Sequence, residues 1–140
     1  MNSETLEYEK YTFIVYPELH FMAYIIKEGV TIDVKDAKEA KKIITDRWPD
    51  IKFYILAQGV KFFTLTREAR TYTATRSFGN NTRAIAFYTT NTSLLVLGKM
   101  YIKIDRPHVP TKFFKDKNEA RYWLEIQMKK FRENQIAAQR

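Results

Sequence analysis

Cysteine is absent from this chain, and histidine occurs only at His20 and His108. The absence of cysteine excludes disulfide bonds, thiolate zinc sites and cysteine nucleophiles. Neither histidine is part of a His-x-x-x-His spacing or of an acidic cluster at metal-ligand spacing, so we expect no metal site and no cofactor. Gly-x-Ser-x-Gly and the glycine-rich phosphate loops are missing as well. The sequence therefore offers no catalytic residue, and we predict that the protein is not an enzyme.

Glycine and proline are scarce too, with four of each in 140 residues. The sequence contains no long linker, repeat or low-complexity tract, so we expect a single domain over residues 1–140. Within it, residues 1–9 and 132–140 are expected to be flexible ends.

Long apolar runs are also missing. The longest apolar cluster, "LLVL" at 94–97, is far shorter than the roughly 20 residues that a membrane-spanning helix needs. The acidic start "MNSETLEYEKY" does not have the pattern of a signal peptide. We expect a cytoplasmic protein without a membrane partner.

Positive charge is in excess but diffuse. The chain has 24 Lys and Arg against 16 Asp and Glu, a net charge of +8, spread from Lys10 to Arg140. Acidic residues interleave with the basic ones, as in "DVKDAKEAKK", which favours a solvated surface over a nucleic-acid site. Nucleic-acid binding through the basic surface is therefore the least favoured function for this chain.

Aromatic and β-branched residues, by contrast, are abundant and predict the strands. "YTFIVYP" (11–17) and "HFMAYIIK" (20–27) are typical of a hairpin. Compact apolar runs at 51–57 and 83–89 predict strands covered on both faces, and 110–114 predicts a further short strand.

Helices are predicted between these strands. Asp33 is an N-cap candidate for an amphipathic helix that ends at Trp48-Pro49, and Asp116 begins a second one with an apolar face from Ala120 to Phe131. The segments 71–78 and 93–104 fit either a strand or a helix by pattern. Because parallel strands need a crossover, usually helical, we predict helices there and a layered α/β domain.

Four stretches, "TIDVKDAKEAKKI", "FYILAQGVKFFTLTREAR", "RAIAFYTTNTSLLVLGKMYIKIDRPHVPTKFF" and "KDKNEARYWLE", resemble the uncharacterised bacterial SpoIIAA-like proteins. Their fold is related to the STAS domain of anti-sigma-factor antagonists, and the resemblance covers roughly residues 10–128. It implies a single-domain SpoIIAA-like, STAS-like α/β fold, in which an N-terminal β-hairpin is followed by alternating helices and strands in a mixed sheet. It also implies that helices cover one side of that sheet and that both ambiguous segments are helical.

The same resemblance implies a role for the segment around Thr66. In STAS antagonists a phosphorylatable hydroxyl stands at the start of a helix, within a motif of roughly Asp-Ser-Ser-Gly. Thr66 occupies the hydroxyl position, but the acid, one serine and the glycine are missing from Thr64-Leu65-Thr66-Arg67. We therefore favour an N-cap role for Thr66 over a phosphorylation site.

Function is predicted from fold analogy, as a non-enzymatic domain that acts through regulatory protein contacts. The candidate contact residues are Phe63, Thr64, Thr66, Arg67 and Arg70; the partner would be a regulatory protein, and a homodimer is left open. An alternative is a carrier of small molecules or lipids with a pocket between helices and sheet. The candidate pocket residues are Tyr101, Arg106 and His108, next to Phe63.

Overall fold

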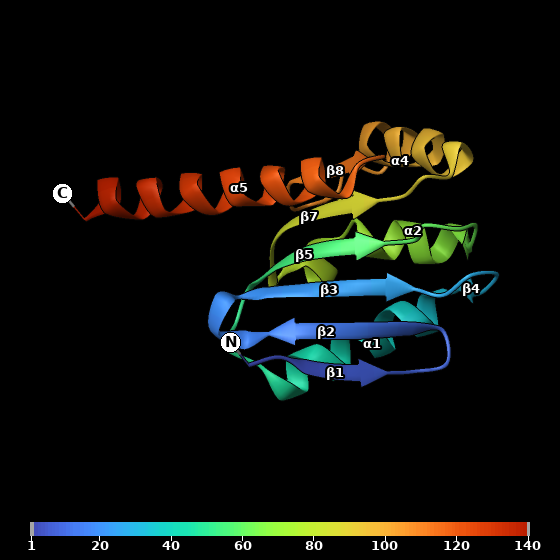
Figure 1. Ribbon diagram of the computed structural model, residues 1–140, viewed down its shortest axis with the longest axis horizontal. Coiled ribbons are helices and arrows are strands. Elements are labelled where there is room, and N and C mark those ends of the chain that lie inside the picture. The colour runs from blue at the N-terminus through green and yellow to red at the C-terminus, as the bar shows by residue number, and fades with distance from the viewer. Residues whose placement is uncertain (1, 140) are drawn as a thin grey trace.

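The computed structural model describes residues 2–139, which are built around one six-stranded mixed sheet in the order β1-β2-β3-β5-β7-β8. β1, β2 and β3 pair antiparallel, whereas β3, β5, β7 and β8 run parallel (Figure 1). The strands of this sheet are β1 (Glu4–Glu7), β2 (Tyr11–Tyr16), β3 (Phe21–Ile26), β5 (Phe53–Gln58), β7 (Thr82–Tyr88) and β8 (Thr111–Phe114). Two short strands, β4 (Thr31–Ile32) and β6 (Thr64–Leu65), pair in parallel as a separate ladder.

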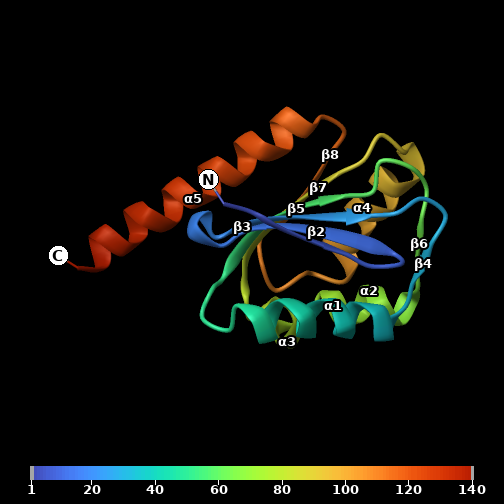
Figure 2. The same cartoon turned by 60° about the horizontal axis from the view of Figure 1, so that its bottom comes forward.

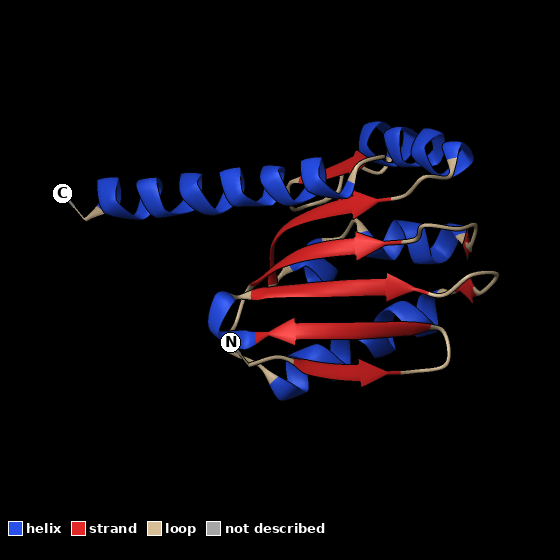
Figure 3. Ribbon diagram, in the orientation of Figure 1, coloured by secondary structure: helices blue, strands red, loops and turns tan. Residues whose placement is uncertain are grey.

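Helices alternate with the strands after the β2–β3 hairpin, as predicted (Figure 3). A 3₁₀ turn (Pro17–Leu19) joins the hairpin, and the α-helices are α1 (Val34–Arg47), α2 (Arg67–Thr73), α3 (Arg76–Gly79), α4 (Thr92–Ile104) and α5 (Lys117–Ala138). Both ambiguous segments are helical, but the first is split in two. Thr75 adopts an extended conformation and its hydroxyl accepts from the Phe78 N–H, so it ends one helical stretch and caps the next. No helix within residues 2–139 is long and apolar enough to cross a bilayer.

The two faces of the sheet are both covered, which corrects the expectation of helices on one side only. α1, α2 and α3 lie beneath the sheet and α5 lies above it (Figure 2). On the α5 face, Ala84 and Ala86 of β7 are fully buried in one cluster with Ala120 and Leu124 of α5, the helix that packs on this strand. Small side chains on the strand let the helix approach closely, and the resulting contact is tight.

Both segments expected to be flexible ends take part in regular structure. Glu4–Glu7 forms an edge strand on β2, where Leu6 packs against the core and Glu4 pairs with Arg47. At the other end, α5 continues to Ala138 and projects past the strands (Figure 1). Arg83 stacks over the Phe131 ring, 3.9 Å from its centroid, which holds this projecting part to the sheet. Met1 and Arg140 lie outside the described residues.

The start of α1 is fixed by a reciprocal capping box. The Asp36 N–H donates to Asp33 Oδ1 over 2.9 Å, and the Asp33 N–H donates to Asp36 Oδ2 over 3.0 Å. Lys10 Nζ donates to the same Asp36 oxygen over 2.6 Å, which ties the turn between β1 and β2 to α1. Burial alone would raise the pKa of Asp36, but the hydrogen bonds from Lys10 and from the Asp33 backbone outweigh it and hold that pKa below its ordinary value.

Replacing Asp36 with Asn should therefore destabilise the protein by about 1 kcal/mol near neutral pH, the usual value of a lost capping contact. A lowered pKa in the folded state gives stability that is complete above the ordinary value of 3.8 and is lost as pH falls through the lower folded-state value. The difference in unfolding free energy between wild type and Asp36→Asn should stay constant from pH 7 to about 5 and shrink below 3.8, by urea titration. Asp46→Asn, which removes a carboxylate from an exposed pair with Lys42, is the control. Its difference in unfolding free energy from wild type should not change in this way as pH falls.

Helix α4 packs so closely on β8 that its contact has no room for a side chain at Gly98. A Cβ placed there would lie 2.4 Å from Cδ2 and 2.5 Å from Cγ of Phe113. Gly98→Ala should therefore destabilise by about 1–3 kcal/mol through overpacking, reduced by up to about 1 kcal/mol of helix propensity. Urea unfolding beside the exposed neighbour variant Lys99→Ala provides the measurement. An unchanged or higher stability of Gly98→Ala would contradict the close packing.

Candidate functional site

A cavity of about 300 Å³ lies between the sheet and the helices α1, α2 and α4. Side chains from the central strands form its floor, among them Ile55 of β5 and Ile85 and Phe87 of β7. The helices that cover it present small residues at several points, including Ala40 of α1 and Gly98 of α4. Side chains do not fill all of the space under these helices, although α4 itself touches Phe113 of β8 at Gly98. The size is at the lower end of small-molecule pockets.

The opening of the cavity is apolar. Phe62, Leu65 and Leu97 line it and yet remain 51%, 38% and 49% exposed. The first two are held by the β4–β6 ladder and its flanking bonds, in which the Gly29 N–H donates to the Phe62 carbonyl over 2.9 Å. Large apolar side chains gathered at the rim of a hollow are typical of a binding site.

Lys41 occupies the part of the cavity near α3, and all of its donors are used. Its ammonium donates to the Phe78 carbonyl over 3.0 Å and to the side-chain oxygens of Asn80 and Asn81 over 2.6 and 3.1 Å. Burial lowers the pKa of Lys41. These three bonds tie α1 to the turn between α3 and β7, so the role of Lys41 is structural.

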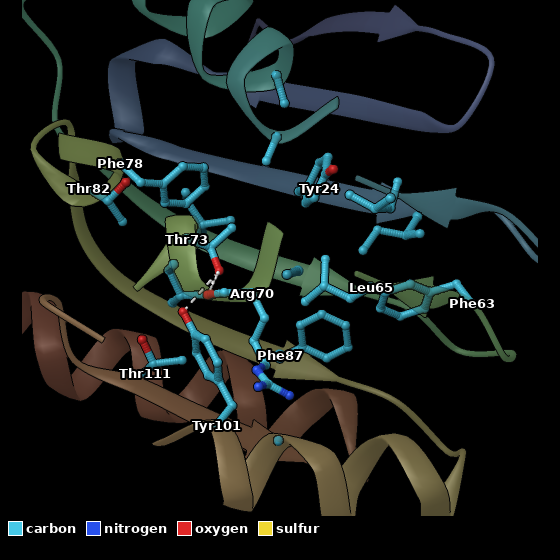
Figure 4. A pocket seen from close by; sticks show the side chains of 18 of the residues that line it. Tyr24, Phe63, Leu65, Arg70, Thr73, Phe78, Thr82, Phe87, Tyr101 and Thr111 are labelled. Atoms are coloured by element: carbon cyan, nitrogen blue, oxygen red, sulfur yellow. Dashed lines mark hydrogen bonds between the residues drawn. The ribbon is translucent and has the colours of Figure 1, made fainter. Parts of the chain in front are cut away.

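Polar contacts join α2 to α4 at the side of the cavity (Figure 4). Arg70 Nε lies 2.9 Å from Asp105 Oδ2, an ion pair in which the N–H is not well aligned with the oxygen. Thr73 Oγ1 donates to the Arg70 carbonyl and lies 3.1 Å from the Tyr101 hydroxyl, which therefore donates to it. Burial chiefly raises the pKa of Tyr101, with Asp105 adding to the effect and the Thr73 bond opposing it. Tyr101 thus stays a neutral donor.

Of the candidate contact residues, only Arg70, Phe63 and Thr64 line the cavity. Phe63 is buried, with 4% exposed, and stacks on Phe87 with centroids 6.0 Å apart. Thr64 is exposed on β6. Thr66 is the N-cap of α2 and accepts from the Ala69 N–H over 3.2 Å, as expected. Arg67 is exposed in the first turn of that helix.

The candidate pocket residues are separated by the fold. Tyr101 lines the cavity, whereas Arg106 and His108 are exposed and do not contribute to the lining. The His108 N–H donates to the Ala74 carbonyl over 3.0 Å, which fixes the loop before β8 against α2.

Sequence reasoning missed the rim residues Phe62, Leu65 and Leu97 and the partner of Arg70, Asp105. One signal was present: the run at 94–97 has more apolar residues than one buried helix face requires. Asp105 gave no such signal, since it follows the helix as an ordinary C-cap residue.

The lining of this cavity is suited to binding a ligand. No group of three or more His, Asp or Glu within residues 2–139 is placed to hold a metal ion. Nor does an acidic side chain of the described chain line the cavity, where Lys41 and Arg70 are the cationic groups. An apolar chamber with a cation and neutral hydroxyls at its side suits a molecule with an apolar body and one polar end.

Comparison with known proteins places the fold. A crystal structure of an uncharacterised DUF3478-family protein from Shewanella loihica PV-4, described as having a SpoIIAA-like fold, superposes with a TM-score of 0.56. The match covers 88% of this chain and 92% of that one at 13% identity, so it shows a shared fold. It confirms the predicted SpoIIAA-like architecture. No curated protein matches the chain.

A family model adds the sequence relationship. The model for a domain of unknown function, DUF7793, matches residues 19–128, which include every element from β3 to the buried part of α5. The chain, with its SpoIIAA-like fold, therefore belongs to the DUF7793 family.

Proposed function

We propose that this protein binds and carries small, largely apolar molecules in the cavity between sheet and helices, and that it is not an enzyme. The observation that carries the proposal is the cavity itself, about 300 Å³ in volume and opening past Phe62, Leu65 and Leu97. By sequence alone the carrier was the alternative to a contact function, and the apolar lining of the cavity now favours the carrier.

Energetics support the proposal. Apolar surface that is left uncovered forgoes about 25 cal/mol per Å² of burial, so an unfilled apolar hollow lowers stability. A protein domain has only about 5–15 kcal/mol of stability in total. Ile55 of β5 and Ile85 of β7, although on interior strands of the sheet, are only partly buried because they face this hollow. A ligand that filled it would restore apolar contacts along the floor.

A larger side chain on the floor of the cavity should weaken ligand binding. Ile85→Phe adds volume on β7 directly below the helices, and we expect the affinity for the apolar fluorophore 1-aminoanthracene to fall about tenfold or more. Fluorescence titration measures the affinity, and thermal unfolding should show little loss of stability because the larger ring occupies existing space. Native mass spectrometry of freshly purified wild type should in addition reveal a bound small molecule.

The matched control is Ile14→Phe, which makes the same change on β2, outside the cavity lining and on the opposite face of the sheet. It should leave binding within about twofold of wild type. Saturable binding that survives Ile85→Phe unchanged would place the ligand elsewhere and contradict the proposal.

The contact function is a second candidate, favoured by the outer surface of α4. Val96, Met100 and Ile104 are 54%, 49% and 64% exposed, and their four-residue spacing places them along one side of the helix. A stripe of this kind suits an apolar surface of a protein partner. It differs from the contact surface expected around Thr66.

Met100→Glu should break such a complex, because it puts an unpaired charge at the centre of an apolar contact. A specific protein should co-purify from native cells with wild type and with Ile136→Glu, an equally exposed position on α5, and not with Met100→Glu. Identical sets of partners for all three proteins would eliminate α4 as the contact surface.

A further inference from the structure

Two cationic side chains line the cavity, and they differ in how many of their hydrogen-bond donors are already used by protein atoms. Lys41 gives its three donors to three protein oxygens within 3.1 Å. Within residues 2–139, the side chain of Arg70 makes one polar contact, between its Nε and Asp105 Oδ2. The two terminal nitrogens of its guanidinium thus remain as donors, and the side chain is 36% exposed. Of the two cations, Arg70 is the one that can receive a ligand.

The direction of Arg70 suits a ligand that fills the cavity. Its side chain reaches from α2 toward α4 and lines the hollow together with Tyr101 and Phe87 (Figure 4). The planar guanidinium presents its terminal N–H groups as a fork, which matches the two oxygens of a carboxylate. No acidic side chain among the described residues lines the cavity, and the Asp105 carboxylate pairs with Arg70 Nε from outside the lining.

We propose that the ligand is an amphiphile with a single carboxylate, held at its charged end by the terminal nitrogens of Arg70, with its apolar body in the cavity. This assignment rests on the proposed carrier function and specifies the ligand class. A volume of about 300 Å³ lies at the lower end of the range of small-molecule pockets. A medium-length aliphatic acid has this size.

Asp105 explains why one negative charge suits the site better than two. The side chain of Asp105 is largely buried, at 13% exposed, and its carboxylate already pairs with Arg70 Nε. A dianionic phosphate would need further cations within reach, and Lys41 is fully engaged elsewhere. Asp105 is a positioning residue: it holds Nε and leaves the outer edge of the guanidinium to the ligand. Its charge also weakens any second anion on Arg70.

The experiment compares decanoate with 1-decanol, which has the same chain length without the charge, as displacers of 1-aminoanthracene at pH 7.5. Decanoate should displace the fluorophore from wild type at about ten- to hundredfold lower concentration, the range expected for hydrogen bonds to a charged group. Arg70→Gln should remove this advantage while the affinity for 1-decanol stays within about twofold. Arg67→Gln, an exposed arginine in the same helix that does not line the cavity, should behave as wild type.

Asp105→Asn gives an independent readout in the opposite direction. Without the competing carboxylate, decanoate should bind more tightly than to wild type, and 1-decanol should be unaffected. This variant tests the proposal even where Arg70→Gln does not fold, because it leaves the arginine in place.

The outcomes separate the carboxylate assignment from the carrier function. Binding of 1-decanol as tight as that of decanoate, or a decanoate preference that persists in Arg70→Gln, would overturn the carboxylate assignment and leave the carrier function standing. Failure of the fluorophore and of both decyl compounds to bind wild type would overturn both.

Discussion

Parallel strands in the middle of a sheet must be covered on both faces, and this protein meets that requirement in two different ways. On one face, the alanines of β7 allow α5 to lie in direct contact with the strands. On the other face, isoleucine and phenylalanine side chains from the same strands stand opposite three separate helices. The alternation of side chains along β5 and β7 therefore produces one layer that packs directly on α5 and another that contains the cavity beside a packed core. The candidate binding site exists because of that asymmetry.

The hollow layer is held together by polar bonds as well as by apolar packing. Lys41 ties α1 to the α3–β7 turn, and the Arg70–Asp105 and Thr73–Tyr101 contacts tie α2 to α4. Such contacts are directional and fix the spacing of the helices, whereas apolar packing alone would favour their collapse onto the sheet. The sequence therefore encodes the cavity, because these polar residues keep the helices apart.

Most of the architecture follows from local patterns that a sequence displays directly. Asp33 and Asp116 mark helix starts by their capping chemistry, and the compact apolar runs around Phe53 and Ala84 mark central strands. The strand at Glu4–Glu7 was not predicted, because it has two glutamates and only one residue that packs against the core, Leu6. The resemblance to STAS-like proteins predicted both ambiguous helices correctly and the one-sided cover incorrectly.

The candidate site was less accessible to sequence reasoning, for a physical reason. A cavity is a difference between the volume enclosed by the elements and the volume of the side chains within, and no local pattern reports that difference. Arg70 and Tyr101 were both singled out, but for separate roles; only the approach of α2 to α4 brings them to one place. Thr66 was predicted as a cap because capping is a local property, and the bond to Ala69 bears this out.

The tight α5 face also limits how the opposite face can deform. An outward shift of β7 would press Ala84 and Ala86 into a helix that already touches them, and close-packed interiors resist such compression. The strands are consequently a rigid support. For the proposed ligands, any adjustment to a larger or smaller molecule would fall to α1, α2 and α4, so these helices would set the discrimination by length and width while the sheet presented the same surface to each ligand.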